Sequence, residues 1–118
     1  MNSKKRVGYI GEKLAVEYLE NNGYIINKTN FYSKYGEIDI IASLENVLVF
    51  VEVKTRTNLL YGEPIDSINK RKLMHMINSA KNYMYINKIY NRENRFDVIE
   101  VYLSGAKCKI NHIKDILN

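Results

Sequence analysis

Two carboxylates and a lysine lie on neighbouring segments that are rich in β-branched residues. Asp39 lies in EIDIIAS (residues 37–43), and Glu52 and Lys54 lie in VLVFVEVKT (residues 47–55). Because side chains alternate along a strand, Glu52 and Lys54 share one face. Paired carboxylates suit a hard cation such as Mg²⁺ or Mn²⁺, and an adjacent lysine can orient an attacking water beside a phosphodiester. These residues are therefore candidates for metal-assisted hydrolysis.

The loop between the two segments decides whether the carboxylates meet. A two-residue loop at Glu45 and Asn46, or a four-residue loop over residues 44–47, places Asp39 opposite Glu52. Opposed Cβ atoms in an antiparallel pair are about 4.5–5.5 Å apart. Two carboxylates at that separation repel each other, so a cation lies between them or one pKa is abnormal. The alternative is a salt-bridge cluster of Asp39, Glu52 and Lys54 on a solvated sheet face.

Two further groups are candidates for this site. The main-chain carbonyl of Val53 lies between the Glu52 and Lys54 side chains and is a possible additional metal ligand. Glu12 falls at the border of the apolar arc of the first helix, where it can face the sheet edge and still reach solvent. The alternative for Glu12 is an ordinary surface glutamate.

The segments that must position these residues alternate between helical and strand patterns. Apolar residues at helical spacing predict a helix from Ser3 to Asn22, ending before Gly23. Asp66 or Ser67 is expected to cap a second helix that runs to about Asn87. Strands are expected at residues 24–28, 37–43, 47–55, 95–103 and 107–113. The order α-β-β-β-α-β-β predicts an α/β fold, a mixed sheet flanked by helices.

Length and composition limit the class of protein. The 118 residues, 46% hydrophobic and 26% charged, predict one globular domain over residues 1–118. The single cysteine, Cys108, excludes an internal disulfide and is expected to be inert. No apolar run approaches the roughly 18 residues that span a bilayer, and the first residues lack a signal-peptide core. We expect a cytoplasmic protein without a membrane partner.

Charge is divided unevenly along the chain. Residues 1–66 carry eight Lys or Arg and nine Asp or Glu, whereas residues 67–118 carry ten and four. A basic half is typical of proteins with a polyanion partner, although a solvated basic helix is an equal alternative. The residues expected to extend a positive surface are Lys70, Arg71, Lys81, Lys88, Arg92 and Arg95. Arg56, on the face of Lys54, suits a phosphate or a salt bridge at the rim of the site.

Four ordered strings carry a resemblance to a known family. They are GEIDIIA at residues 36–42, LVFVEVKTR at residues 48–56, Ile68 and Lys72 with Ala80 and Tyr83, and RFDV at residues 95–98. Together with Gly11, Glu12 and Ala15, these strings resemble the YraN family of bacterial proteins. The pattern is similar to the PD-(D/E)XK nuclease superfamily and, within it, to archaeal Holliday-junction resolvases. The resemblance implies a restriction-endonuclease-like three-layer fold.

The resemblance also implies roles for individual residues. Asp39 matches the metal-binding aspartate, and Glu52 and Lys54 match the E-x-K element. Glu12 matches an acid of the first helix that completes the site, and Lys72 matches a polar residue near substrate phosphate. The sequence departs from the superfamily name at Ile38, which stands where the name has proline. Glu37 adds an extra acid without an assigned role.

The expected function is Mg²⁺- or Mn²⁺-dependent hydrolysis of DNA, including branched intermediates, with Glu12, Asp39, Glu52 and Lys54 as catalytic residues. A homodimer is expected by analogy with the resolvases. The alternative is a non-catalytic nucleic-acid-binding or adaptor module that retains the fold. Tyr32, Tyr35 and Tyr61 are candidates for stacking on unpaired bases, whereas Tyr18 and Tyr83 are expected in the core and His75 and His112 at the surface.

Overall fold

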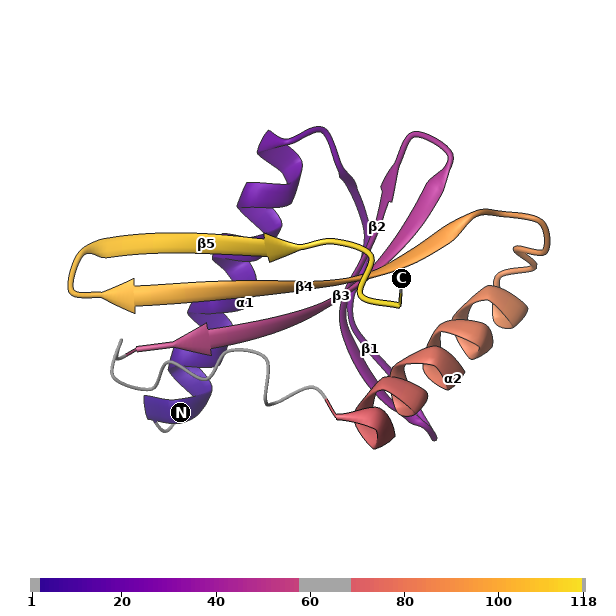
Figure 1. The fold of residues 1–118 in the computed structure, drawn as a ribbon, viewed down its shortest axis with the longest axis horizontal. Helices are drawn as coiled ribbons and strands as arrows, with labels where there is room; N and C mark the ends of the chain where they lie inside the picture. Colours follow the sequence, from indigo (N-terminus) through magenta and orange to yellow (C-terminus); the bar gives the residue numbers. More distant parts are fainter. Residues whose placement is uncertain (1–2, 58–68, 118) are drawn as a thin grey trace.

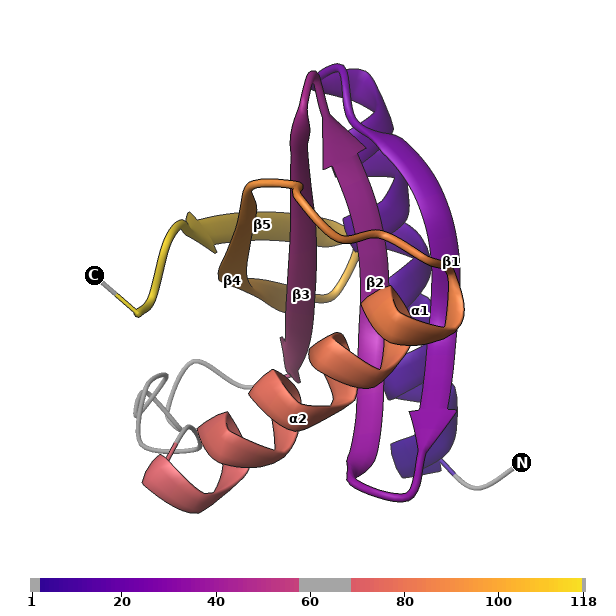
Figure 2. The same ribbon diagram turned by 90° about the vertical axis from the view of Figure 1, so that its right-hand side faces the viewer.

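A mixed five-stranded sheet separates the two helices in the computed structural model (Figures 1 and 2). The structure describes residues 3–57 and 69–117. The elements are α1 (Ser3–Asn21), β1 (Ile25–Ser33), β2 (Gly36–Leu44), β3 (Val47–Arg56), α2 (Lys70–Ile86), β4 (Asn94–Ser104) and β5 (Lys107–Ile113). This order and the three-layer α/β arrangement confirm the predicted fold class.

The strands follow one another across the sheet in chain order, from β1 to β5. All neighbouring strands are antiparallel except β3 and β4, which run parallel and are joined through α2. In Figure 2, α2 lies in front of the sheet and α1 behind it. The parallel pair therefore needs the crossover helix, and that helix covers the face opposite α1.

Each helix covers its own apolar cluster. Ala15 and Leu19 of α1 pack on a cluster that includes Ile40, Val51 and Ile99. The α2 cluster is a separate one, formed by Ile38, Ile41, Leu48, Phe50, Met76, Ala80 and Phe96. Tyr18 packs against the first cluster and Tyr83 against the second, which confirms that both tyrosines contribute to the core.

The ends of α1 and α2 follow from local residues. Gly23 has a φ of +89°, the left-handed conformation that closes α1 as predicted. The start of α2 differs from the prediction, because Asn69 is its N-cap and accepts a hydrogen bond from the Lys72 N–H at 2.8 Å. Asp66 and Ser67, the predicted caps, lie outside the described residues, as does Tyr61.

Strand β1 is longer than predicted. It runs to Ser33 rather than Lys28, because it pairs with β2 along its whole length and a bulge between Ile26 and Lys28 absorbs the irregularity. Most of its side chains are exposed or half-buried, so its sequence carries no clear alternating pattern. No helix within residues 3–57 and 69–117 is long and apolar enough to cross a membrane.

Candidate active site

The β2–β3 hairpin has the predicted register. Leu44 pairs with Val47 across the two-residue loop, and the ladder continues to Ile40 and Val51. Next to that pair, the Val53 N–H donates a hydrogen bond to the side chain of Asp39, at 2.8 Å from Oδ2. Asp39 and Glu52, which follow the last ladder pair, are only 9% and 7% exposed. The hairpin therefore brings two buried carboxylates together.

Two lysines from different elements converge on Glu52. Lys54 Nζ lies 3.0 Å from Glu52 Oε2, and Lys72 Nζ lies 2.9 Å from the same oxygen. Lys54 comes from β3, two residues along the strand, whereas Lys72 reaches across from the first turn of α2. The Asn69 cap fixes where that turn begins and so places Lys72 over the sheet. The sequence placed Lys72 near substrate phosphate but did not predict its contact with Glu52.

Glu12 and Glu37 complete an acidic group around Asp39. With its amide nitrogen facing the carboxylates, Asn30 donates to Glu12 Oε1 at 3.1 Å and to Glu37 Oε2 at 3.0 Å. Glu12 comes from α1 and is half-buried, whereas Glu37, at the start of β2, is exposed. We call Glu12, Glu37, Asp39 and Glu52 the acidic site.

The acidic site carries an uncompensated negative charge. Burial, and then the nearby Glu52 carboxylate, raise the pKa of Asp39 from 3.8 to about 7; Glu12 and Glu37 act in the same direction. Burial and Glu37 also raise the pKa of Glu12. Four carboxyl groups thus lie near two lysine ammonium groups, those of Lys54 and Lys72, and the raised pKa of Asp39 reflects this excess of acid. The site is therefore suited to a divalent cation.

Lys54 is the lysine that loses its proton more readily. Burial lowers the pKa of Lys54, and the adjacent Lys72 lowers it further against the attraction of Glu52. The Lys54 side chain is 16% exposed and that of Lys72 is 37% exposed. The more hydrated Lys72 thus holds the positive charge, and Lys54 is the better proton acceptor of the two.

The residues present fit a hard cation through a small set of oxygen donors. Asp39 and Glu52 supply buried carboxylate oxygens, and the main chain of Val53 lies beside Asp39, so its carbonyl is a candidate third donor. Among the described residues, no group of three or more His, Cys, Asp or Glu side chains is arranged to hold one ion. A cation held here would take its remaining ligands from the main chain and water, as Mg²⁺ commonly does.

The basic residues expected to hold nucleic acid lie around this site. Arg56 lies near the end of β3 and is half-buried. Lys70 and Arg71 are the first two residues of α2, and both are exposed. Tyr32 is 72% exposed. The charge of Glu37 is the main cause that raises the pKa of the Tyr32 hydroxyl. Tyr32 therefore lies beside the acidic site.

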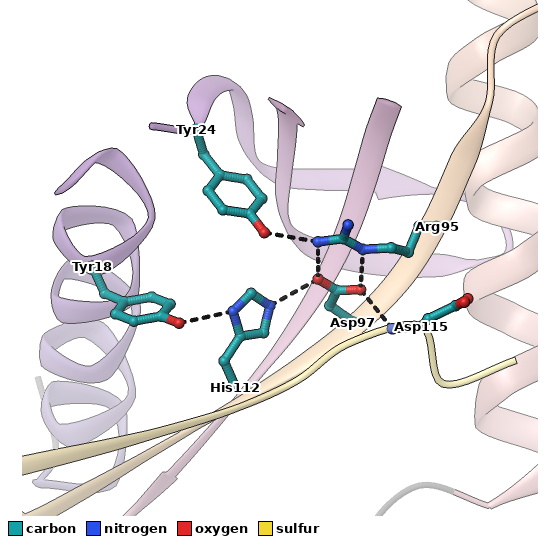
Figure 3. Close-up of polar contacts among 6 residues, drawn as sticks. All are labelled: Tyr18, Tyr24, Arg95, Asp97, His112 and Asp115. Carbon is teal, nitrogen blue, oxygen red and sulfur yellow. Dashed lines mark hydrogen bonds and ion pairs between the residues drawn. The ribbon is translucent and has the colours of Figure 1, made fainter. Parts of the chain in front are cut away.

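A second polar cluster, which the sequence did not predict, ties the opposite end of the sheet to α1 (Figure 3). Arg95 Nε and Nη2 donate to the two oxygens of Asp97, both at 2.9 Å. His112 Nε2 lies 2.8 Å from Asp97 Oδ2, and the Tyr18 hydroxyl lies 3.0 Å from His112 Nδ1. Tyr24 accepts from Arg95 at 2.7 Å. We call these five residues the Asp97 network.

The Asp97 network corrects two predictions. His112 is not at the surface: its side chain is 4% exposed, whereas His75 is exposed as predicted. Arg95 is paired with a fully buried carboxylate and does not extend a positive surface. The RFDV string contained the signal, since a charged pair two residues apart in a strand shares one face.

Comparison with known proteins identifies the same family as the sequence motifs. The model of the uncharacterised protein family UPF0102 matches residues 11–101. A UPF0102 protein of Caldanaerobacter subterraneus subsp. tengcongensis is 42% identical over 116 residues, covering 98% of this chain and 95% of the relative. A UPF0102 protein of Alkaliphilus oremlandii is 46% identical over 113 residues, covering 94% and 97%. The chain therefore belongs to the UPF0102 family, also known as the YraN family.

Proposed function

We propose that this protein is a metal-dependent endonuclease that hydrolyses phosphodiester bonds in DNA. The observation that carries the proposal is the proximity of buried Asp39 and Glu52, with Lys54 beside them, at a site where burial and the neighbouring carboxylates raise the pKa of Asp39 to about 7. Buried carboxylates without compensating cations are costly, and they cluster at functional sites. A purely structural salt bridge needs no such excess of acid.

Each residue of the site has a distinct role in this proposal. Asp39, Glu52 and the Val53 carbonyl would hold Mg²⁺ or Mn²⁺, and the ion would supply an acidified water and neutralise phosphate charge. In its neutral form, which its lowered pKa favours, Lys54 orients the attacking water and accepts its proton, and the departing sugar oxygen takes up a proton from solvent water. Lys72 remains charged and stabilises the phosphate as negative charge develops on it. Glu12 lies at the outer side of the site, where the Asn30 amide links it to Glu37.

The basic residues around the site support DNA as the substrate. Arg56 and the exposed Lys70 and Arg71 extend the positive charge of Lys72 over the beginning of α2. Lysine and arginine bind phosphate without regard to base sequence, so branched as well as linear DNA fits this surface. A homodimer would present two such sites to the symmetric strands of a branched intermediate, and we place this activity in the cytoplasm.

A second candidate function rests on one observation. Lys54 and Lys72 both contact the same Glu52 oxygen, so Glu52 already has two cationic partners without a metal ion. A non-catalytic module that binds nucleic acid through its basic surface would keep these salt bridges intact. The uncompensated charge at Asp39 and Glu12 favours the enzyme.

A cleavage assay separates the two functions. Wild-type protein and Asp39→Asn are incubated with four-way-junction, flapped and linear duplex DNA, in Mg²⁺, in Mn²⁺ or in EDTA. We expect cleavage by the wild type in Mg²⁺ or Mn²⁺, none in EDTA, and a loss of at least 100-fold in Asp39→Asn. Glu93→Gln removes an exposed carboxylate just before β4 and serves as the matched control.

Two outcomes contradict the proposal. Cleavage that persists in EDTA or in Asp39→Asn rules out a mechanism through this carboxylate. DNA binding by gel shift with no cleavage in any metal supports the non-catalytic module instead.

A further inference from the structure

Two glycines of α1 differ in what surrounds them. A Cβ at Gly11 would overlap the side chain of Thr55, so glycine there lets the helix lie directly on β3. A Cβ at Gly8 would meet nothing within 4 Å, and Gly8 has an ordinary negative φ. Glycine inside a helix lowers its stability. Packing within the protein accounts for Gly11 but not for Gly8.

The space beside Gly8 belongs to a hollow between α1 and the end of β3. This hollow has a volume of about 640 Å³. Val7 and Gly8 line it from the helix, Thr55 from β3, and Thr57 from just beyond the end of β3. Glu12 and Lys54 also line it, so it opens directly onto the acidic site. Figure 1 shows β3 crossing the N-terminal half of α1 at this point.

The opposite side of Glu12 has the wrong charge for DNA. There a hollow of about 400 Å³ lies between α1 and β1, and Glu12, Glu17 and Glu20 line it against the single cation of Lys13. Those carboxylates repel phosphate. The hollow beside Gly8 has Lys54, two threonine hydroxyls and one carboxylate. A DNA strand that reaches the acidic site is therefore directed toward Gly8.

We propose that the hollow beside Gly8 binds one unpaired nucleotide next to the phosphate that is cut. This inference rests on the proposed function and names its substrate more closely. A hollow of 640 Å³ is in the size range of small-ligand sites. A base inside a duplex exposes only its edges in the grooves, so a base that enters this hollow is unpaired. Gly8 and Val7 line the hollow on the helix side and leave room for a base, and Lys54 on the strand side supplies a hydrogen-bond donor for the phosphate.

The position of Gly8 allows a variant that fills the hollow without unfolding the protein. Gly8→Leu and Gly8→Ala replace glycine with good helix formers in open space, so we expect the thermal midpoint to stay equal to the wild type or rise by a few degrees. Ile10→Leu is the matched control, since Ile10 is exposed on the same helix and does not line the hollow. Circular dichroism on heating checks the fold of each variant.

Binding is measured by fluorescence anisotropy with a labelled hexathymidylate and with a blunt 20-base-pair duplex, in Mg²⁺. All proteins carry Asp39→Asn, which prevents the proposed cleavage. We expect Gly8→Leu to weaken hexathymidylate binding at least tenfold, Gly8→Ala to weaken it about twofold to threefold, and Ile10→Leu to leave it unchanged. Duplex binding should be the same in all of them.

Unchanged hexathymidylate binding by Gly8→Leu overturns the inference, as does an equal loss of duplex binding. The proposed function is judged separately, by wild-type cleavage. Cleavage with no effect of Gly8→Leu on binding leaves the endonuclease and removes the nucleotide site. Loss of binding in Gly8→Leu without any wild-type cleavage leaves a single-strand-binding site on a non-catalytic protein.

Discussion

Burial and three neighbouring carboxylates act together on the Asp39 side chain. Its pKa rises from 3.8 to about 7, so a protonated Asp39 is common near neutral pH in the metal-free protein. The native state then binds a proton that the unfolded chain releases. Because the folded pKa is raised, the free energy of unfolding falls as pH rises from about 4 to above 7.

Asp39→Asn directly tests whether the free energy of unfolding falls as pH rises. The amide keeps an acceptor for the Val53 N–H but carries no charge. We expect Asp39→Asn to raise the free energy of unfolding by about 1–3 kcal/mol at pH 8 in EDTA, with little change at pH 4. Urea unfolding at both pH values measures this difference. A variant less stable than the wild type at pH 8 would show that Asp39 is instead stabilised as an anion.

Lys72→Met tests the contact between α2 and Glu52. Loss of this ammonium leaves Glu52 with Lys54 alone and removes the positive neighbour that lowers the pKa of Lys54. We expect DNA cleavage to fall roughly 10–100-fold and its pH optimum to move toward alkaline values. Lys81→Met, an exposed lysine of the same helix, is the control. An equal effect of both substitutions would assign Lys72 only a general role in DNA attraction.

The register that brings Asp39 and Glu52 to the same end of the hairpin was predictable, because a hairpin with a short loop has few registers. The Lys72 contact was not predictable in the same way, since it depends on where α2 begins and how it packs on the sheet. The same holds for Asn30, whose amide joins Glu12 to Glu37 from an edge strand with no clear pattern. Contacts within one hairpin can be predicted from the sequence. Contacts between elements can be predicted only when the packing of those elements is known.

The contact between α1 and β3 sets how closely the helix approaches the acidic site. Gly11 lies against Thr55, and Glu12 is the next residue on the helix. We expect Gly11→Ala to lower the free energy of unfolding by about 1–3 kcal/mol, although alanine is the better helix former. Urea unfolding measures this loss. Gly11→Ala combined with Thr55→Gly should recover part of it, and a stable Gly11→Ala single variant would contradict the close packing.

The element boundaries show which local signals suffice. The Gly23 end of α1 and the register of the β2–β3 hairpin were predicted from residue types, whereas the two-residue loop was one of two alternatives. The start of α2 depends on Asn69 as its cap, and a sequence with Asp66, Ser67 and Asn69 in succession offers several caps. The full length of β1 follows from pairing with β2, so it is a property of the sheet rather than of the strand.

The Asp97 network joins the middle and both ends of the described chain. Burial raises the pKa of Asp97, but hydrogen bonds from His112 and Arg95 outweigh this effect, so its pKa lies below 3.8. Its contribution to stability is therefore present above pH 4 and is lost as pH falls through that lowered pKa. Asp97 therefore stabilises the protein more as pH rises, whereas Asp39 stabilises it less.

Asp97→Asn tests the structural role of this network. We expect it to lower the free energy of unfolding by about 2–4 kcal/mol at pH 7, because Arg95 and His112 lose a buried anionic partner. The loss should shrink as pH falls through the lowered pKa of Asp97, because the wild-type carboxylate then becomes protonated itself. Urea unfolding across this pH range measures it, with exposed Glu20→Gln as control. A pH-independent loss would assign the effect to packing rather than charge.

At the scale of the whole molecule, the acidic first half and the basic second half of the chain meet at the acidic site. The acids of the first half include all four carboxylates of the acidic site, whereas Lys72 and its basic neighbours come from α2 in the second half. The Asp97 network lay beyond sequence reasoning, because Tyr18 and His112 are 94 residues apart and meet only when β5 packs beside α1.

The central claim is that Asp39 and Glu52 hold a divalent cation, and isothermal titration of Mn²⁺ into wild-type protein and Asp39→Asn tests it most directly. The account predicts saturable binding by the wild type, with proton release near pH 7 as Asp39 ionises, and at least tenfold weaker binding without proton release in Asp39→Asn. Equal Mn²⁺ binding by the two proteins would contradict it.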